Sequence, residues 1–99
     1  MEKTLYVMFI ERGKLHDKMT KAAAERHVEN LRRLDDAGQL VLCGPLTGFP
    51  GIEGMVILKA QSLAEAEGIC AAEPLVAEGY AAYRLCALQV ADRDNGYLL

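Results

Sequence analysis

Short apolar runs and helix-like segments alternate along this chain, and their order constrains the fold more than any other feature. Residues 3–11 form a nearly continuous apolar run that is too short for a buried helix and is followed by Gly13, which predicts a strand covered on both faces. The other predicted strands are residues 39–43, 54–60 and 80–90, and the predicted helices are residues 20–37 and 62–72. The predicted order is therefore strand, helix, strand, strand, helix, strand.

Start and stop signals support both predicted helices. Thr20 is a suitable N-cap for the first helix, and Gly38 follows its last residue. The segment Ser62–Glu65 has the sequence of a capping box at the start of the second helix. Pro74 disfavours the helical conformation in the residue before it. Glu73 is therefore expected at the exit of the second helix, where the chain turns back toward the sheet.

This order of elements predicts an α+β fold. We expect a ferredoxin-like βαββαβ arrangement over a single domain, residues 1–99, in which an antiparallel sheet carries two helices on one face. The other sheet face is then bare. Because 52% of the residues are hydrophobic, we expect the same face of a second copy to cover it. The result is a homodimer of back-to-back sheets.

Charge and composition argue against several classes of partner. The net charge is −3 and acidic and basic residues are mixed along the helices, so we expect no nucleic-acid partner and no membrane anchor. No apolar run is long enough to span a bilayer, and the strand pattern follows Met1–Lys3 without a signal peptide, which favours a cytoplasmic protein. The sequence has no phosphate loop, dinucleotide fingerprint or metal-ligand cluster, so we expect no cofactor and no metal.

Three cysteines form neither an even set nor a CxxC pair. They are Cys43, Cys70 and Cys86. Reduced, buried thiols are therefore expected rather than a disulfide framework or a zinc site. Cys43 ends a predicted strand directly before Gly44 and Pro45 and could line a pocket there. Gly44 and Pro45 either let the backbone pass close to a bound molecule or simply make a turn.

His27 is the residue that points most directly to chemistry. It lies on the apolar stripe of the first helix with Ala23, Leu31 and Leu34, so its ring is expected to point inward. Two interpretations remain open: a hydrogen-bonded core histidine, or a ring that transfers a proton at cellular pH. In both cases we expect His27 to line a cavity between helix and sheet, with at least one ring nitrogen hydrogen-bonded.

Three other positions are weaker candidates. Arg84 interrupts the apolar alternation of the last strand, and it could pair with Glu73, anchor an anionic substrate or lie exposed at the sheet edge. His16 lies in the polar segment 12–19 and is expected to be solvated. Asp36 lies nine residues after His27, on the opposite side of an ideal helix, and is expected to be a solvated acid.

Three segments of the chain resemble the motifs of the YciI-like (YCII-related) family. They are His27–Leu31, Ala37–Pro45 and Ala71–Gly79. In that family a helix histidine is followed by a glycine, a short strand ending in Gly-Pro, and a later Asp-Pro-x-Val-x-x-Gly turn. The resemblance covers nearly the whole chain. It rests on the order and separation of the three segments, since each alone is weak.

The resemblance implies a dimeric ferredoxin-like α+β barrel with a His–Asp site. It also implies relatedness to a dehydrochlorinase that acts on chlorinated hydroxyhydroquinone and, in fold, to muconolactone isomerase. His27 matches the family histidine, and Glu73 occupies the place of the aspartate. Because glutamate is one methylene longer, we expect a tight pairing of carboxylate and imidazole to be displaced by about an ångström.

Two functions follow from these residues. The first is a small cofactor-independent enzyme of the lyase, dehydrochlorinase or isomerase type, in which His27 acts as general acid or base on a small cyclic metabolite and Glu73 orients it. Cys43, Gly44, Pro45 and Arg84 are its candidate substrate-binding residues. The alternative is a non-catalytic dimeric module that binds a small molecule or a protein, with His27 as a polar contact.

Overall fold

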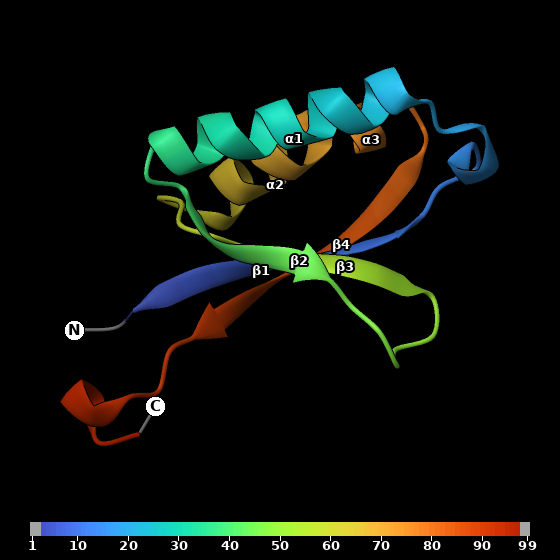
Figure 1. Ribbon diagram of the computed structural model, residues 1–99. Coiled ribbons are helices and arrows are strands. Elements are labelled where there is room, and N and C mark those ends of the chain that lie inside the picture. The colour runs from blue at the N-terminus through green and yellow to red at the C-terminus, as the bar shows by residue number, and fades with distance from the viewer. Residues whose placement is uncertain (1–2, 98–99) are drawn as a thin grey trace.

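The computed structural model describes residues 3–97 and has the predicted ferredoxin-like α+β fold. One antiparallel sheet has the strand order β2-β3-β1-β4 (Figure 1). The strands are β1 (Thr4–Arg12), β2 (Leu40–Pro45), β3 (Ile52–Leu58) and β4 (Ala81–Gln89). The α-helices are α1 (Lys21–Asp36), α2 (Leu63–Ala72) and α3 (Pro74–Ala77), and the 3-10 turns are η1 (His16–Lys18) and η2 (Arg93–Asn95).

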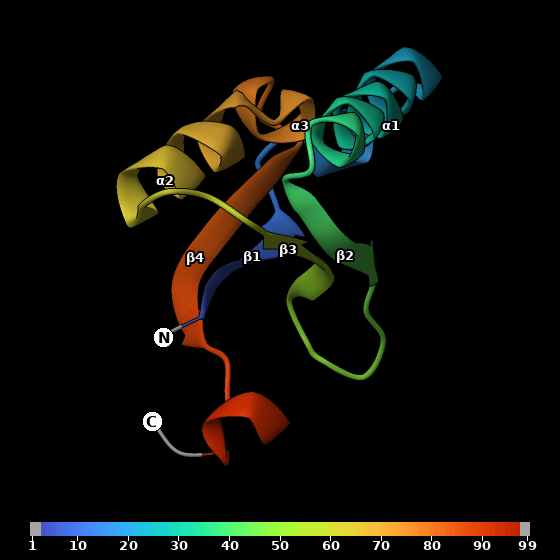
Figure 2. The same ribbon diagram turned by 90° about the vertical axis from the view of Figure 1, so that its left-hand side faces the viewer.

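All three α-helices lie on one face of the sheet, as Figures 1 and 2 show from two directions. The predicted N-caps are present, because Thr20 Oγ1 accepts from the amide of Ala23 and Ser62 Oγ accepts from the amide of Glu65. The Glu65 carboxylate accepts from Gln39 instead of closing the predicted capping box. No helix in residues 3–97 has the length and apolar character needed to cross a membrane.

The main core lies between the sheet and the helices. Its buried residues are Tyr6, Met8, Val56, Leu58, Ala66 and Cys70. Alternate residues of β1 point to the other face, where Phe9 makes an edge-to-face contact with Phe49 of the β2–β3 loop. Within this chain the helices therefore cover β1 on one face only, and the β2–β3 loop contacts its second face through Phe49.

Two local features differ from the elements expected along the chain. Gly44 and Pro45 do not leave the sheet but form the last two residues of β2, opposite Met55 and Gly54 of β3. The backbones of β2 and β3 lie close together at Gly54, where an added Cβ would lie 3.1 Å from the carbonyl oxygen of Gly44. The second difference is α3, which the sequence did not indicate. It begins directly after α2 because Pro74 takes the first position of a new helix, where its missing N–H is not needed.

Candidate functional site

His27 and Glu73 form a direct contact between α1 and the junction of α2 and α3. The ring nitrogen Nδ1 of His27 lies 2.5 Å from Oε1 of Glu73. The Glu73 side chain is only 4% exposed and that of His27 is 23% exposed. Such a buried carboxylate is tolerated when its oxygens are hydrogen-bonded.

Glu73 is held in place by the start of α3. As N-cap of that helix it has a non-helical backbone conformation, and its Oε2 accepts from the amides of Leu75 and Val76 at 2.8 and 3.2 Å. One carboxylate oxygen thus caps the helix, while the other is hydrogen-bonded to His27. The extra methylene of glutamate therefore does not prevent a direct contact with the imidazole.

This contact defines the hydrogen-bonding role of each ring nitrogen in neutral His27. A carboxylate oxygen can only accept, so Nδ1 carries the proton and donates it to Glu73. Nε2 is then the acceptor nitrogen. It has no hydrogen-bond partner in residues 3–97, and the ring lines a cavity. The ring therefore has an unpaired acceptor nitrogen available at the cavity that it lines.

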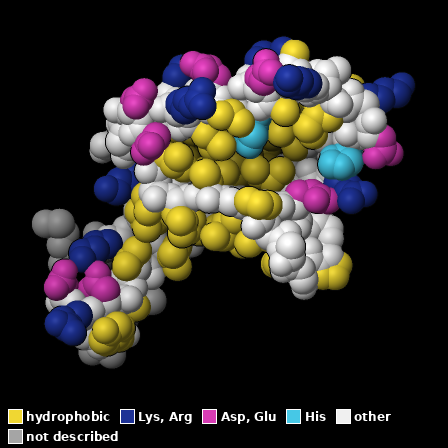
Figure 3. All heavy atoms as spheres, in the orientation of Figure 1, with side chains coloured by type: hydrophobic (Ala, Val, Ile, Leu, Met, Phe, Trp, Pro, Cys, Tyr) yellow, Lys and Arg dark blue, Asp and Glu magenta, His cyan; other side chains and the backbone are white. Residues whose placement is uncertain are grey.

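The cavity lies between α1 and the sheet and has a volume of about 350 Å³. Its apolar lining includes Ile10, Met19, Leu31, Val56, Leu75 and Ala81. Figure 3 shows it as a yellow hollow beneath α1, with one histidine inside and the other at its right-hand rim. A cavity of this size is at the lower end of small-molecule sites and fits a ligand of about one ring.

Three candidate binding residues line this cavity from β2. Cys43 and Pro45 point to the helix side of the sheet because they pair with Val56 and Gly54 of β3, and Gly44 adds backbone between them. Together they form the wall opposite α1.

Arg84 does not join the site. It pairs with Phe9 in the β1–β4 ladder and points to the sheet face without helices, where it borders a separate hollow beside Phe49. The ion pair with Glu73 that the sequence allowed does not form, because the sheet lies between the two side chains.

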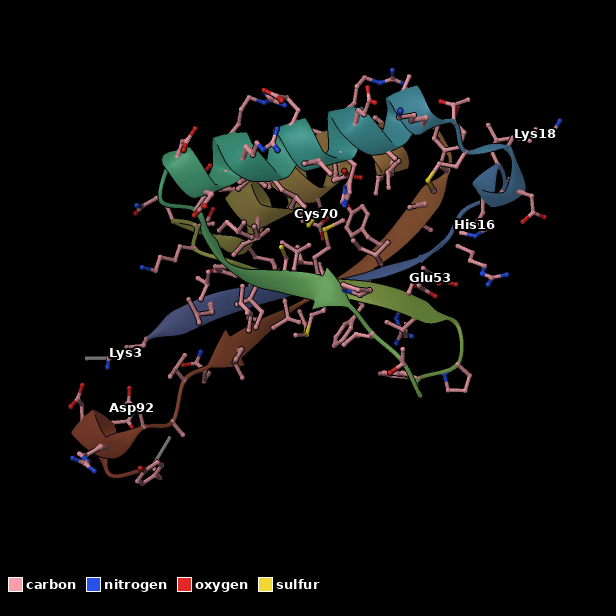
Figure 4. The ribbon with its side chains drawn as sticks, in the orientation of Figure 1. Lys3, His16, Lys18, Glu53, Cys70 and Asp92 are labelled. Atoms are coloured by element: carbon pink, nitrogen blue, oxygen red, sulfur yellow. The ribbon has the colours of Figure 1, made fainter. Side chains whose placement is uncertain are left out.

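His16 lines the cavity, contrary to the expectation that it is simply solvated. It lies at the mouth with Glu53 of β3, and Figure 4 shows the labelled side chains of these two residues near each other. The hydrogen bond from Arg12 lowers the pKa of Glu53, and the charges of Arg12 and His16 add to this effect. The Arg12 guanidinium bonds to this carboxylate at 2.5 Å. No local pattern in the sequence marks His16, because its position depends on backbone contacts with residues 79 and 80, far along the chain.

The cysteines differ in their surroundings. Cys70 is fully buried, and burial, together with the charges of Glu67 and Glu73, raises the pKa of its thiol to about 11. Cys43 and Cys86 are exposed, so the expectation of buried thiols was wrong for these two. Asp36 is exposed at the end of α1, as predicted. Within residues 3–97 no group of three or more His, Cys, Asp or Glu side chains is placed to hold a metal ion.

The chain is similar to known proteins in family and in fold. The structure of 5-chloro-2-hydroxyhydroquinone dehydrochlorinase (TftG) from Burkholderia phenoliruptrix AC1100, in complex with 2,5-dihydroxybenzoquinone, superposes with a TM-score of 0.68 over 92% of this chain and 98% of that chain, at 16% identity. The curated proteins contain no sequence match to this chain. The family model of the YCII-related domain matches residues 4–89. This chain therefore belongs to the YCII-related domain family.

Proposed function

We propose that this protein is a small enzyme in which His27 acts as general base and Glu73 orients it. The reaction is removal of a proton from a small cyclic substrate, followed by elimination or double-bond migration. The observation that carries the proposal is the contact of 2.5 Å between His27 Nδ1 and Glu73 Oε1, which leaves Nε2 free at an apolar cavity.

The proposed step needs no redox partner. His27 Nε2 takes a proton from a carbon or oxygen of the ring, and the electron pair of that bond forms a new double bond. In an elimination the leaving group departs with its own electron pair, whereas in an isomerisation the pair is protonated at another carbon. Glu73 stabilises the imidazolium that forms and does not itself need to take the proton.

The substrate class rests on the cavity and on the family. A cavity of about 350 Å³ with an apolar lining favours a single-ring substrate with few polar groups. TftG, which shares the fold, is a dehydrochlorinase of a substituted hydroquinone. We therefore propose hydroxylated or halogenated six-membered rings as the first substrates to assay, with loss of a proton and a halide as the reaction.

Chloride release from 5-chloro-2-hydroxyhydroquinone tests the proposal. His27→Gln is expected to lower kcat by about 10²–10⁴-fold, the usual contribution of a general base. The matched control is Glu78→Gln, because Glu78 also links α1 to the end of α3, through Arg26, but does not line the cavity. Equal rates for wild type and His27→Gln contradict the mechanism. Binding of 2,5-dihydroxybenzoquinone without turnover of any ring substrate favours the binding-module alternative.

We also propose that the protein forms a homodimer through the sheet face opposite the helices. Leu42, Phe49 and Leu88 on that side are 57%, 55% and 42% exposed. The β2–β3 loop and the C-terminal segment around η2 both extend past this face and frame it from two ends (Figures 1 and 2). The resulting radius of gyration, 14.3 Å, exceeds the roughly 13 Å of a compact chain of this length. A second copy is the occupant that this frame and the apolar surface favour.

A further inference from the structure

The mouth of the cavity holds a second ionisable group that the proposed reaction does not use. His16 reaches this position because residues 13–15 are hydrogen-bonded to residues 79 and 80, directly before β4. The amide of Gly13 donates to the carbonyl of Tyr80 and the amide of Leu15 to that of Gly79, both at 3.0 Å. An added Cβ on Gly13 would lie 2.5 Å from the Gly79 oxygen, so the two segments touch through their backbones.

The two histidines lie on different parts of the cavity wall. His27 comes from α1 and its ring lines the interior, whereas His16 comes from η1 and lies at the rim (Figure 3). Figure 3 shows hydrophobic side chains between the two histidines. A single-ring ligand bound in the cavity can therefore contact one imidazole in the interior and a second imidazole at the rim.

The residues at the rim also determine which polar group of a ligand can bind there. The Glu53 carboxylate is already paired with Arg12 at 2.5 Å. The His16 ring has no hydrogen-bond partner in the part of the chain that the structure describes. An imidazole can donate N–H to an oxygen anion or a carbonyl, and it does so more strongly when protonated.

We propose that His16 is a ligand-binding residue that selects rings with a second oxygen substituent, away from the one that meets His27. The second substituent accepts a hydrogen bond from His16 at the rim. This inference rests on the proposed function, since it uses the same cavity. It adds that the preferred ligand is a ring with two polar ends rather than one.

Two probes with a common ring test this inference by NMR. They are 4-hydroxybenzoate and 4-methylphenol, which share the phenol group but carry either a carboxylate or a methyl opposite it. The chain has only two histidines, so the imidazole signals of the full-length protein are assigned with His16→Gln and His27→Gln. We expect 4-hydroxybenzoate to shift both signals and 4-methylphenol to shift only that of His27.

Affinity measurements complete the test. His16→Ala is expected to weaken the binding of 4-hydroxybenzoate by about threefold to tenfold, because it removes a partly exposed hydrogen bond to an anion. The affinity for 4-methylphenol should not change. Lys18→Ala is the control, because Lys18 lies in the same turn but does not line the cavity and projects away from it (Figure 4).

Each outcome decides between the two proposals. If 4-hydroxybenzoate shifts the His27 signal alone, the role of His16 is overturned and the proposed function stands. If Lys18→Ala weakens binding as much as His16→Ala, the effect is one of general charge and the inference is also overturned. If neither probe shifts His27, both proposals are contradicted.

Discussion

His27 and Glu73 are 46 residues apart in the chain, yet His27 Nδ1 and Glu73 Oε1 lie 2.5 Å apart. The same carboxylate accepts two backbone amides at the start of α3. Glu73 therefore has a fixed orientation before any ligand binds, and it transmits that orientation to the imidazole. Because one carboxylate contacts both the imidazole and the start of α3, we expect a specific effect when Glu73 is replaced by glutamine.

Glu73→Gln is expected to reverse the tautomer of neutral His27. The amides of Leu75 and Val76 need an acceptor, so the single oxygen of the new side-chain amide stays with them and its NH₂ group turns to the ring. Nδ1 must then accept, and the proton moves to Nε2. The nitrogen facing the cavity loses its free electron pair, which is the wrong tautomer for a general base. Imidazole ¹⁵N chemical shifts report which nitrogen is protonated.

Glu78→Gln is the control for this experiment, since it alters an exposed ion pair between the same helices. It should leave the His27 tautomer unchanged. Nδ1–H in both wild type and Glu73→Gln contradicts the orienting role assigned to Glu73. Activity should follow the tautomer, with kcat falling in Glu73→Gln and unchanged in Glu78→Gln.

Two glycines should respond in opposite directions to replacement by alanine. Gly13→Ala places a methyl group 2.5 Å from the Gly79 oxygen, so the backbone contact that positions η1 must open. We expect a loss of about 1–3 kcal/mol in the free energy of unfolding, as for other forced core contacts. Gly68→Ala lies in α2 with no atom within 4 Å of the new Cβ. It should stabilise the protein by about 0.5–1 kcal/mol. Urea unfolding measures both, and equal effects contradict the packing described here.

The sequence predicted the elements that depend on local signals. The first helix follows from Thr20, the apolar stripe through His27 and the stop at Gly38, and these features act within a few residues of one another. Glu73 was placed at a helix exit because proline restricts the residue before it, and its backbone is indeed non-helical. These local rules also placed both members of the candidate pair on the helix layer.

What the sequence could not predict depends on contacts between distant segments. The four residues of α3 are too few to show a helical period, and Pro74 indicates a helix end as readily as a helix start. His16 reaches the cavity only because Gly13 and Leu15 bond to residues 79 and 80. Arg84 lies on the far face because of the register between β1 and β4, which local alternation alone does not fix.

Thiol reactivity should separate Cys43 from Cys70. The thiolate is the reactive form, and the raised pKa of Cys70, about 11, leaves little thiolate at neutral or mildly alkaline pH. Cys70 is also buried, whereas Cys43 is exposed at the cavity wall. We expect alkylation at pH 8 to modify Cys43 quickly and Cys70 only after unfolding. A bound 2,5-dihydroxybenzoquinone should slow the reaction of Cys43. Mass spectrometry of peptides measures each site, and rapid modification of native Cys70 contradicts its burial.

Light scattering should give a mass of twice 10.8 kDa at micromolar concentration, because the sheet face opposite the helices needs a cover. Leu88→Lys places a charge on that face, where Leu88 is 42% exposed, and should shift the mass toward one chain. Leu63→Lys is the matched control, since Leu63 is 50% exposed but begins α2 on the other side of the sheet.

Cys86 points to the same face as Leu88, so its thiol reactivity gives an independent measure of whether that face is covered. It should react slowly in the wild-type dimer and quickly in Leu88→Lys. A wild-type mass of one chain together with fast Cys86 modification rules out a dimer through this face.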